Sequence, residues 1–161
     1  MNDSARVARD GDKPSLFELE KFLPYQLSLL TNTISAGIAR SYRNLHEISV
    51  IEWRIMAVLG RYPGLTASEI GERTAMEKVP ISRAVKNLEA RGLLERTTDR
   101  CDRRRQRLQL SPGHGSKMLE EIIPLAKRYE TQLLDALSTV DQRVLGKILQ
   151  KLQTKARILN S

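Results

Sequence analysis

Four tetrads along the chain carry a pattern that starts helices in proteins. Each has Ser or Thr followed three residues later by Glu or Gln, and they lie at residues 15–18, 49–52, 66–69 and 139–142. In such a capping box the two side chains satisfy backbone N–H groups that the first helical turn leaves unpaired. Apolar residues recur at intervals of three and four after these tetrads, as they do on one face of a helix. The sequence therefore predicts a mainly α protein.

The order of these helices follows from the boxes and from the positions of proline and glycine. The first helix is predicted to begin at Ser15, and Pro24 either bends or restarts it. Shorter helices are predicted from residue 49 and from residues 66 to about 73. The next runs from Glu77 to residue 90 or 91, with Pro80 in its first turn and Gly92 as its C-terminal cap. Two long amphipathic helices complete the chain, one after residue 113 and one from residue 139.

One part of the chain departs from helical spacing. Residues 93–98 and 106–110 read as two short strands, and the second alternates polar and apolar side chains. The seven residues between them, 99–105, include four arginines and form the tip of the predicted hairpin. A helix, a short helix, a turn, a helix and a basic hairpin, in this order, are typical of a recognition helix that enters the major groove of DNA beside a loop that reaches the minor groove.

Positive charge is concentrated in the same part of the chain. The protein has a net charge of +8, and residues 73–107 hold 11 Lys and Arg side chains against 5 Asp and Glu side chains. This segment therefore carries all but two of the net positive charges. Closely spaced cations favour a polyphosphate or an anionic membrane surface, because neutralised phosphates release condensed counterions. The alternative is an ordinary solvated basic face.

A resemblance to the MarR family of multiple-antibiotic-resistance-type regulators rests on four segments: LTASEIGERT (65–74), VPISRAVKNLEARGLLER (79–96), DRR (102–104) and LS (110–111). Its specific part is 65–111, and with the flanking helices it covers roughly 20–157. It implies a winged helix-turn-helix with a small β-hairpin wing and N- and C-terminal dimerisation helices. Residues 1–14 are then a mobile tail, 15–46 the N-terminal dimerisation helix, 47–111 the DNA-binding region and 112–161 the C-terminal dimerisation helices. The chain departs from the family after Leu110, where it reads SPGHG.

The resemblance makes the helix at 77–91 the recognition helix and residues 99–105 the wing tip. Arg and Lys donate well to guanine edges and phosphates, and Val79 or Pro80 could meet a thymine methyl. The expected DNA contacts are Lys78, Pro80, Ser82, Arg83 and Lys86 in the helix and Arg100, Asp102, Arg103, Arg104 and Arg105 in the wing. Asp102 is expected to hold Arg104, so that a neighbouring arginine can enter the minor groove. Which of the three arginines at 103–105 enters stays open.

The apolar stripes of the first helix and of the last two exceed what one small winged domain can cover. They predict a homodimer, with an intramolecular bundle as the alternative. Two-fold symmetry would set the recognition helices roughly 34–36 Å apart on a pseudo-palindromic operator in double-stranded DNA. The predicted function is a sequence-specific transcriptional regulator, and the resemblance implies repression. The alternative is a nonspecific nucleoid-type or RNA-binding protein, which needs no separate dimerisation helices.

The resemblance also implies an effector, a small and often aromatic or phenolic acid that binds between the dimerisation helices and the winged domain and releases the DNA. Candidate lining residues are Leu27, Thr31, Ile34, Trp53 and Met56, with Arg40, Arg43 and His46 available to meet a carboxylate or phosphate. The simpler interpretation of each apolar member is core packing. For each cation it is contact with solvent or DNA.

Other chemistry finds little support in the sequence. Cys101 is the only cysteine, and we interpret it as an incidental thiol; the alternative is a redox-responsive regulator with a thiolate that nearby arginines favour. His46 and His114 lack metal-ligand spacing, and no phosphate-binding glycine loop or nucleophile–base set is present, so we expect no enzyme, metal or cofactor. The absence of a secretory signal and of a long apolar run predicts a cytoplasmic protein without a membrane partner.

Overall fold

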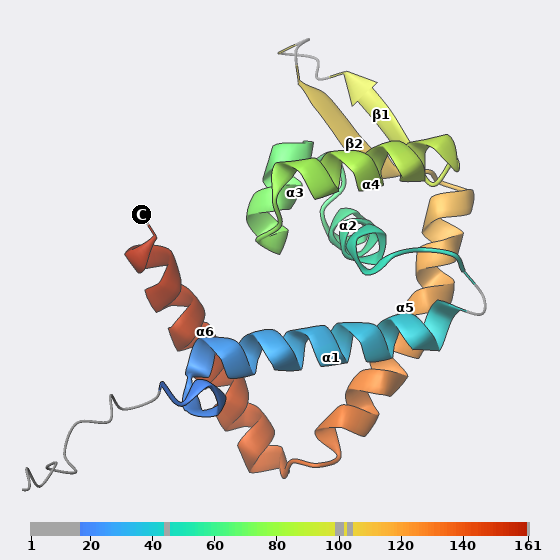
Figure 1. The fold of residues 1–161 in the computed structure, drawn as a ribbon. Helices are drawn as coiled ribbons and strands as arrows, with labels where there is room; N and C mark the ends of the chain where they lie inside the picture. Colours follow the sequence, from blue (N-terminus) through green and yellow to red (C-terminus); the bar gives the residue numbers. More distant parts are fainter. Residues whose placement is uncertain (1–16, 44–45, 99–101, 103–104, 161) are drawn as a thin grey trace, which may run out of the picture. The chain divides into compact units, whose positions relative to one another are not determined.

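The computed structural model describes residues 17–43, 46–98, 102 and 105–160. The predicted mobile tail at 1–14 lies outside these ranges. The elements are the 3-10 turn η1 (Leu19–Lys21), helices α1 (Leu23–Arg43), α2 (Val50–Arg61), α3 (Ala67–Thr74) and α4 (Lys78–Ala90), strands β1 (Leu94–Thr98) and β2 (Gln106–Leu110), and helices α5 (His114–Leu134) and α6 (Thr139–Leu159). Figure 1 shows this mainly helical fold with its single antiparallel hairpin, which confirms the predicted fold class. The chain forms two units, residues 1–34 and 35–161.

The core of the second unit lies among the C-terminal end of α1, α2, α3, α4, the hairpin and the first half of α5. Its largest fully buried side chains are Tyr42, Ile55, Met56, Leu59, Ile70, Ile81, Leu88, Leu93, Leu108 and Ile122. Burying one such apolar side chain contributes about 1.5–3 kcal/mol to folding. The winged part therefore has an apolar centre of its own, and α4 contributes one face to it.

The capping boxes predicted at 49–52 and 66–69 are confirmed. At the start of α2, the Glu52 N–H donates to Ser49 Oγ at 3.2 Å and the Ser49 N–H donates to Glu52 Oε2 at 2.6 Å. At the start of α3, the Glu69 N–H donates to Thr66 Oγ1 at 3.3 Å and the Thr66 N–H donates to Glu69 Oε2 at 2.7 Å. Local sequence thus sets both helix starts.

The box predicted for the last helix is wrong by one residue. Ser138, with an extended backbone, is the cap of α6, and its hydroxyl accepts from the Asp141 N–H at 3.2 Å. Thr139 is already helical. A carboxylate at the third helical position pairs with the cap as Glu does elsewhere, so Ser138 and Asp141 form the box in place of Thr139 and Gln142.

The predicted start of the first helix also needs correction. Before α1, the described residues form only a 3-10 turn at residues 19–21, and α1 begins at Leu23. Ser15, where the helix was predicted to begin, lies outside the described residues. Pro24 is the second residue of α1, where its missing N–H costs no hydrogen bond, so it restarts the helix. Within the first unit, Leu23, Leu27 and Leu30 are all exposed. This part of α1 carries an uncovered apolar stripe.

A Schellman motif ends α4 and leads the chain into the wing. Gly92 has φ +66°, its N–H donates to the Glu89 carbonyl at 2.9 Å, and the Leu93 N–H donates to the Leu88 carbonyl at 2.9 Å. The predicted cap at Gly92 is confirmed. Strand β1 then pairs with β2 over its full length. The sequence did not predict a further pairing, in which Leu65 forms an isolated bridge with Leu108 of β2.

Ser111 joins the base of the wing to α5. Its Oγ donates to the Gly92 carbonyl at 2.7 Å and accepts from the Gly115 N–H at 2.8 Å, while its own N–H donates to the Leu93 carbonyl at 3.0 Å. These bonds tie the end of α4, the hairpin and the first turn of α5 together. The SPGHG segment, where the chain departs from the family pattern, therefore forms a defined junction.

Ala75, in the turn between α3 and α4, has φ +52° and ψ +37°. This left-handed conformation costs an L-residue about 1–2 kcal/mol. We expect Ala75→Gly to raise the free energy of unfolding by about 0.5 kcal/mol, because the relieved strain exceeds the extra chain entropy of glycine. Urea denaturation measures the change. As a control, Ala90→Gly in α4 should destabilise; equal destabilisation by both changes would contradict the strain at Ala75.

Candidate nucleic-acid interface

Helix α4 has one buried and one accessible face. Its buried side chains are Ile81, Ala84, Val85 and Leu88. On the other side Lys78, Val79, Arg83 and Lys86 are exposed, and Pro80 and Ser82 are half-buried. The structure thus brings every residue predicted for DNA contact in this helix onto accessible surface.

The N-terminus of α4 is positive. Its unpaired backbone N–H groups amount to about half an elementary charge. Lys78 adds a positive charge that the negative charge of the exposed cap residue Glu77 offsets, and no acidic residue lies within the first turn, so the backbone N–H groups remain the main source of positive charge. This end of α4 is therefore suited to an anion such as a DNA phosphate.

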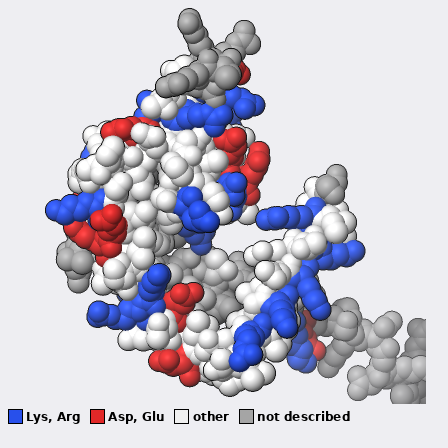
Figure 2. Space-filling view, turned by 180° about the vertical axis from the view of Figure 1, so that it is seen from behind, with Lys and Arg blue, Asp and Glu red and all other residues white. Residues whose placement is uncertain are grey.

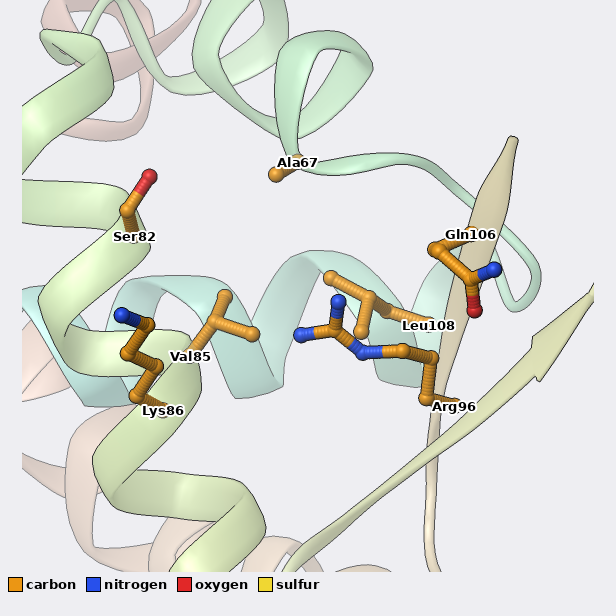
Figure 3. A pocket seen from close by; sticks show the side chains of 7 residues that line it. All are labelled: Ala67, Ser82, Val85, Lys86, Arg96, Gln106 and Leu108. Atoms are coloured by element: carbon orange, nitrogen blue, oxygen red, sulfur yellow. The ribbon is translucent and has the colours of Figure 1, made fainter. Parts of the chain in front are cut away.

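The wing approaches α4 across a cavity of about 180 Å³. The cavity is lined by Ala67, Ser82, Val85, Lys86, Arg96, Gln106 and Leu108, which come from α3, α4 and both strands (Figure 3). Hydroxyl, ammonium, guanidinium and amide groups on its walls are all hydrogen-bond donors. Helix α4 and the wing strands therefore place four donor side chains, Ser82, Lys86, Arg96 and Gln106, around one cavity.

Two residues around this cavity, Arg96 and Gln106, were not predicted. Arg96 makes a bidentate pair with Glu89 of α4, with Nε 2.6 Å from Oε1 and Nη2 2.7 Å from Oε2. These hydrogen bonds raise the pKa of Arg96 above its usual value. The alternation of the two strands could have pointed to both residues, because they share the face of the hairpin that carries Leu94 and Leu108.

The wing tip is described only at Asp102 and Arg105. Arg105 Nε lies 3.8 Å from Asp102 Oδ2, and the Arg105 N–H donates to the Asp102 carbonyl at 2.9 Å. The predicted partner of Asp102 was Arg104. That residue lies outside the described residues, as do Arg100, Cys101 and Arg103. Their roles in DNA contact, and the redox alternative at Cys101, stay predictions.

Glu52 anchors α4 to the start of α2. Its side chain is buried, Oε1 accepts from Asn87 Nδ2 of α4, and Oε2 accepts from the Ser49 N–H. Burial alone would raise the pKa of Glu52, but the hydrogen bonds from Ser49 and Asn87 and the charge of Arg91 outweigh it, so the pKa lies below its usual value. Helix α4 is thus held by an ionised carboxylate.

This anchor predicts a loss of stability in acid. A folded-state pKa below the unfolded value gives stability that is complete above the unfolded pKa and is lost as the pH falls through the folded pKa. We expect Glu52→Gln to cost about 2 kcal/mol at pH 7, because an amide cannot accept at both ends. Below about pH 4.5, we also expect the free energy of unfolding to fall less steeply in this variant than in the wild-type protein. Urea unfolding between about pH 7 and 3 measures both effects.

Glu72→Gln provides the control for this prediction, because it removes an exposed carboxylate from α3. Its decline in acid should match that of the wild-type protein. If Glu52→Gln lost stability in acid as steeply as the wild type, other carboxylates would be the cause of the acid sensitivity.

The residues predicted to bind an effector lie in different environments. Leu27, Thr31 and Ile34 belong to the first unit, and the other five to the second. Met56 is fully buried in the core, Trp53 is half-buried, and Arg40 and Arg43 are exposed. The structure therefore does not describe them as one site.

Tyr42, which the sequence analysis did not single out, lies beside Trp53 with the ring centroids 6.1 Å apart. Its hydroxyl is buried and has no hydrogen-bond partner among the described residues. His46 lies nearby in sequence, and its Nε2 is 3.0 Å from Glu121 Oε2 of α5, although the contact is not aligned as a hydrogen bond. Burial raises the pKa of Tyr42, so its hydroxyl stays protonated at neutral pH and can donate.

The described residues lack two further features. They contain no group of three or more His, Cys, Asp or Glu side chains placed to hold a metal ion. None of the helices in the described ranges combines the length and the apolar character that crossing a membrane requires.

The family model of the MarR family matches residues 46–105. Transcriptional regulator HosA of Escherichia coli is 25% identical over 114 residues, which cover 71% of this chain and 84% of HosA. HTH-type transcriptional regulator TtmR of Methylorubrum extorquens is 30% identical over 106 residues, which cover 63% of this chain and 54% of TtmR. Residues 46–105 are thus a segment of MarR type. HosA and TtmR are transcriptional regulators, and regulators of this family are not enzymes.

Solved structures share the fold of this chain. A probable transcriptional regulator from Pseudomonas aeruginosa is 26% identical with a TM-score of 0.71, covering 83% of this chain and 98% of its own. The repressor CouR, solved on a 23-mer DNA duplex, is 22% identical with a TM-score of 0.74 and coverages of 88% and 99%. PcaV from Streptomyces coelicolor, solved with its natural ligand, is 21% identical with a TM-score of 0.72 and coverages of 86% and 96%.

Proposed function

We propose that this MarR-family protein is a homodimeric repressor that binds a pseudo-palindromic operator and is released by a small ligand. The observation that carries the proposal is the accessible face of α4, where Lys78, Arg83 and Lys86 are exposed beside the wing. Arg and Lys donate to the O6 and N7 atoms of guanine and to phosphates. CouR, a repressor with the same fold, has been solved on a DNA duplex, which supports this use of the surface.

A competition titration tests the DNA-binding part of the proposal. Purified protein is titrated against duplex DNA from upstream of its own gene, and then against an operator selected from random duplexes, with excess random competitor at near-physiological salt. A regulator is expected to prefer its operator by roughly 10³-fold or more. Equal affinity for operator and competitor would favour the nonspecific nucleoid-type alternative.

Helix α6 supports the homodimer. It buries none of its residues, although Leu145, Ile148, Leu149 and Leu152 follow one another at helical spacing. Figure 2 shows Lys and Arg side chains along the same helix, where Lys147, Lys151 and Lys155 share a different face. A 21-residue helix is about 31 Å long, enough to contribute substantially to the roughly 800 Å² that each partner buries in a stable dimer.

Leu152→Glu tests this interface, because it puts a charge into the apolar face of α6. Sedimentation velocity is expected to show a dimer for the wild-type protein and monomers for the variant, with a matching loss of operator affinity. Gln150→Glu is the control, since residue 150 lies about 160° around the helix from residue 152. A wild-type monomer, or a dimeric Leu152→Glu protein, would contradict the proposed interface.

The buried Tyr42 hydroxyl supports a ligand with an acceptor group. A buried donor without a partner costs about 1–3 kcal/mol, which an acceptor on a ligand would recover. The ligand must bind the released dimer more tightly than the DNA-bound one, since equal affinity shifts nothing. Titration of the protein–operator complex with benzoic and phenolic acids tests release, and Tyr42→Phe should weaken any response. If none of these acids released the DNA, the result would count against an aromatic acid as effector.

A further inference from the structure

The inner face of the wing changes from apolar to polar at Arg96. On this face Leu94 of β1 lies opposite Leu110, and Arg96 lies opposite Leu108. Leu94 and Leu108 are buried, whereas the Arg96 side chain is 42% exposed. Towards the tip the same face continues with Thr98 opposite Gln106. The wing therefore packs on the core only at its base, and apolar contact ends at Arg96.

The cavity between α4 and the wing lies at the level where apolar contact ends. It separates Ser82 and Lys86 of α4 from Gln106 of β2, and Arg96 extends from β1 toward α4 within it (Figure 3). Close packing normally fixes the distance between two elements, and a cavity of about 180 Å³ provides no such contact here. At this level, apolar packing therefore does not set the distance between α4 and the wing.

The pair of Glu89 and Arg96 joins α4 to β1 beside this cavity. Its two hydrogen bonds, at 2.6 and 2.7 Å, run side by side from one guanidinium to one carboxylate. Such a fork fixes the orientation of the two groups as well as their separation. Since Glu89 is in the last turn of α4 and Arg96 is in the middle of β1, the fork relates the direction of the wing to that of the recognition helix.

We propose that the Glu89–Arg96 pair positions the wing relative to α4, and that it thereby determines how strictly the protein selects the base pairs beneath the wing tip. This inference rests on the proposed DNA binding. Minor-groove contact depends on where the tip enters, and α4 reads the major groove independently. Arg96 is accordingly a positioning residue, and its effect reaches the DNA through the wing.

A direct phosphate contact by Arg96 would have different consequences. Glu89 neutralises Arg96, and a neutral pair adds little to the counterion release that drives phosphate binding. If Arg96 held a phosphate, Glu89→Gln would raise affinity for every duplex and steepen its salt dependence. If the pair positions the wing, Glu89→Gln lowers selectivity beneath the wing tip.

The test compares three duplexes: the operator selected by the wild-type protein, one changed only at the flanking positions beneath the wings, and one changed only beneath the recognition helices. Their affinities are measured for the wild type, Glu89→Gln, Arg96→Lys and the reversed pair Glu89→Arg with Arg96→Glu. In both single variants, we expect the affinity ratio between the selected operator and the duplex changed at the flanking positions to fall about tenfold. This is the effect of roughly one mismatched base pair. The preference beneath the recognition helices should be retained, and the reversed pair should recover part of the lost selectivity.

Glu95→Gln is the matched control, because it removes a carboxylate from the outer face of β1 and should leave both preferences unchanged. Thermal unfolding verifies that each variant is folded. Single variants with wild-type preference at the flanking positions would overturn the inference, as would an increase in affinity of Glu89→Gln for all three duplexes. A wild-type protein that selects no operator would overturn the proposed function, and this inference with it.

Discussion

Arg83→Ala is expected to weaken operator binding by about 1–3 kcal/mol, roughly 5- to 150-fold. The side chain is exposed on the accessible face of α4, one turn from the positive end of the helix. Because it contributes nothing to the core, the free energy of unfolding should stay within about 0.5 kcal/mol of the wild-type value. Fluorescence anisotropy with a labelled operator measures the affinity.

Two further variants test whether the loss of affinity is specific to Arg83. Arg128→Ala removes another exposed arginine, from α5, and should leave operator affinity unchanged. Arg83→Lys keeps the charge but loses the planar fork, so it should retain phosphate binding and lose bidentate guanine readout. Wild-type affinity in Arg83→Ala would mean that α4 does not use this residue to bind DNA.

Gly115→Ala is expected to lower the free energy of unfolding by about 3 kcal/mol, at the upper end of the cost of overpacking. Gly115 is buried in the first turn of α5, where a Cβ would collide with the backbone carbonyl of Leu93 and approach Ser111 Oγ to 3.1 Å. Neither neighbour can move freely, since the Leu93 carbonyl accepts from the Ser111 N–H at the base of the wing. Urea unfolding measures the loss.

Gly146→Ala in α6 is the matched control. A Cβ at this helical position has no neighbour within 4 Å, so the change should stabilise the protein by about 0.5–1 kcal/mol through helix propensity. If the two alanine variants had equal stability, the close approach of α5 to Leu93 would not be a determinant of the fold.

Local sequence predicts most of the secondary structure because each signal acts within a few residues. The box at Ser49, the glycine at 92 and the alternation of β2 all work this way, and the structure confirms them. The bridge between Leu65 and Leu108 was missed because one residue has no periodicity and its partner is distant in sequence. At α6 two neighbouring hydroxyl residues compete to cap the helix, and an acid at the third helical position decides for Ser138.

The accessible face of α4 could be predicted because buried Ile81, Val85 and Leu88 determine which side is turned outward. For Arg96, strand alternation indicates the face of the hairpin but not the partner of the side chain. A charged residue in a short strand is usually solvated, and its meaning depends on Glu89, which belongs to a different element. The Tyr42 hydroxyl was missed for a related reason, since only the packing around it shows that it is buried without a partner.

The short hairpin also bears on how this protein behaves at high concentration. In the described part of the chain β1 pairs with β2 alone, so its other edge presents backbone donors and acceptors that a second chain could use to extend the sheet. Only five residues long, and carrying Glu95 and Arg96, this edge is a poor template for such growth. The charges of the wing strand thus protect against aggregation, and a more apolar β1 would expose the protein to edge-to-edge association.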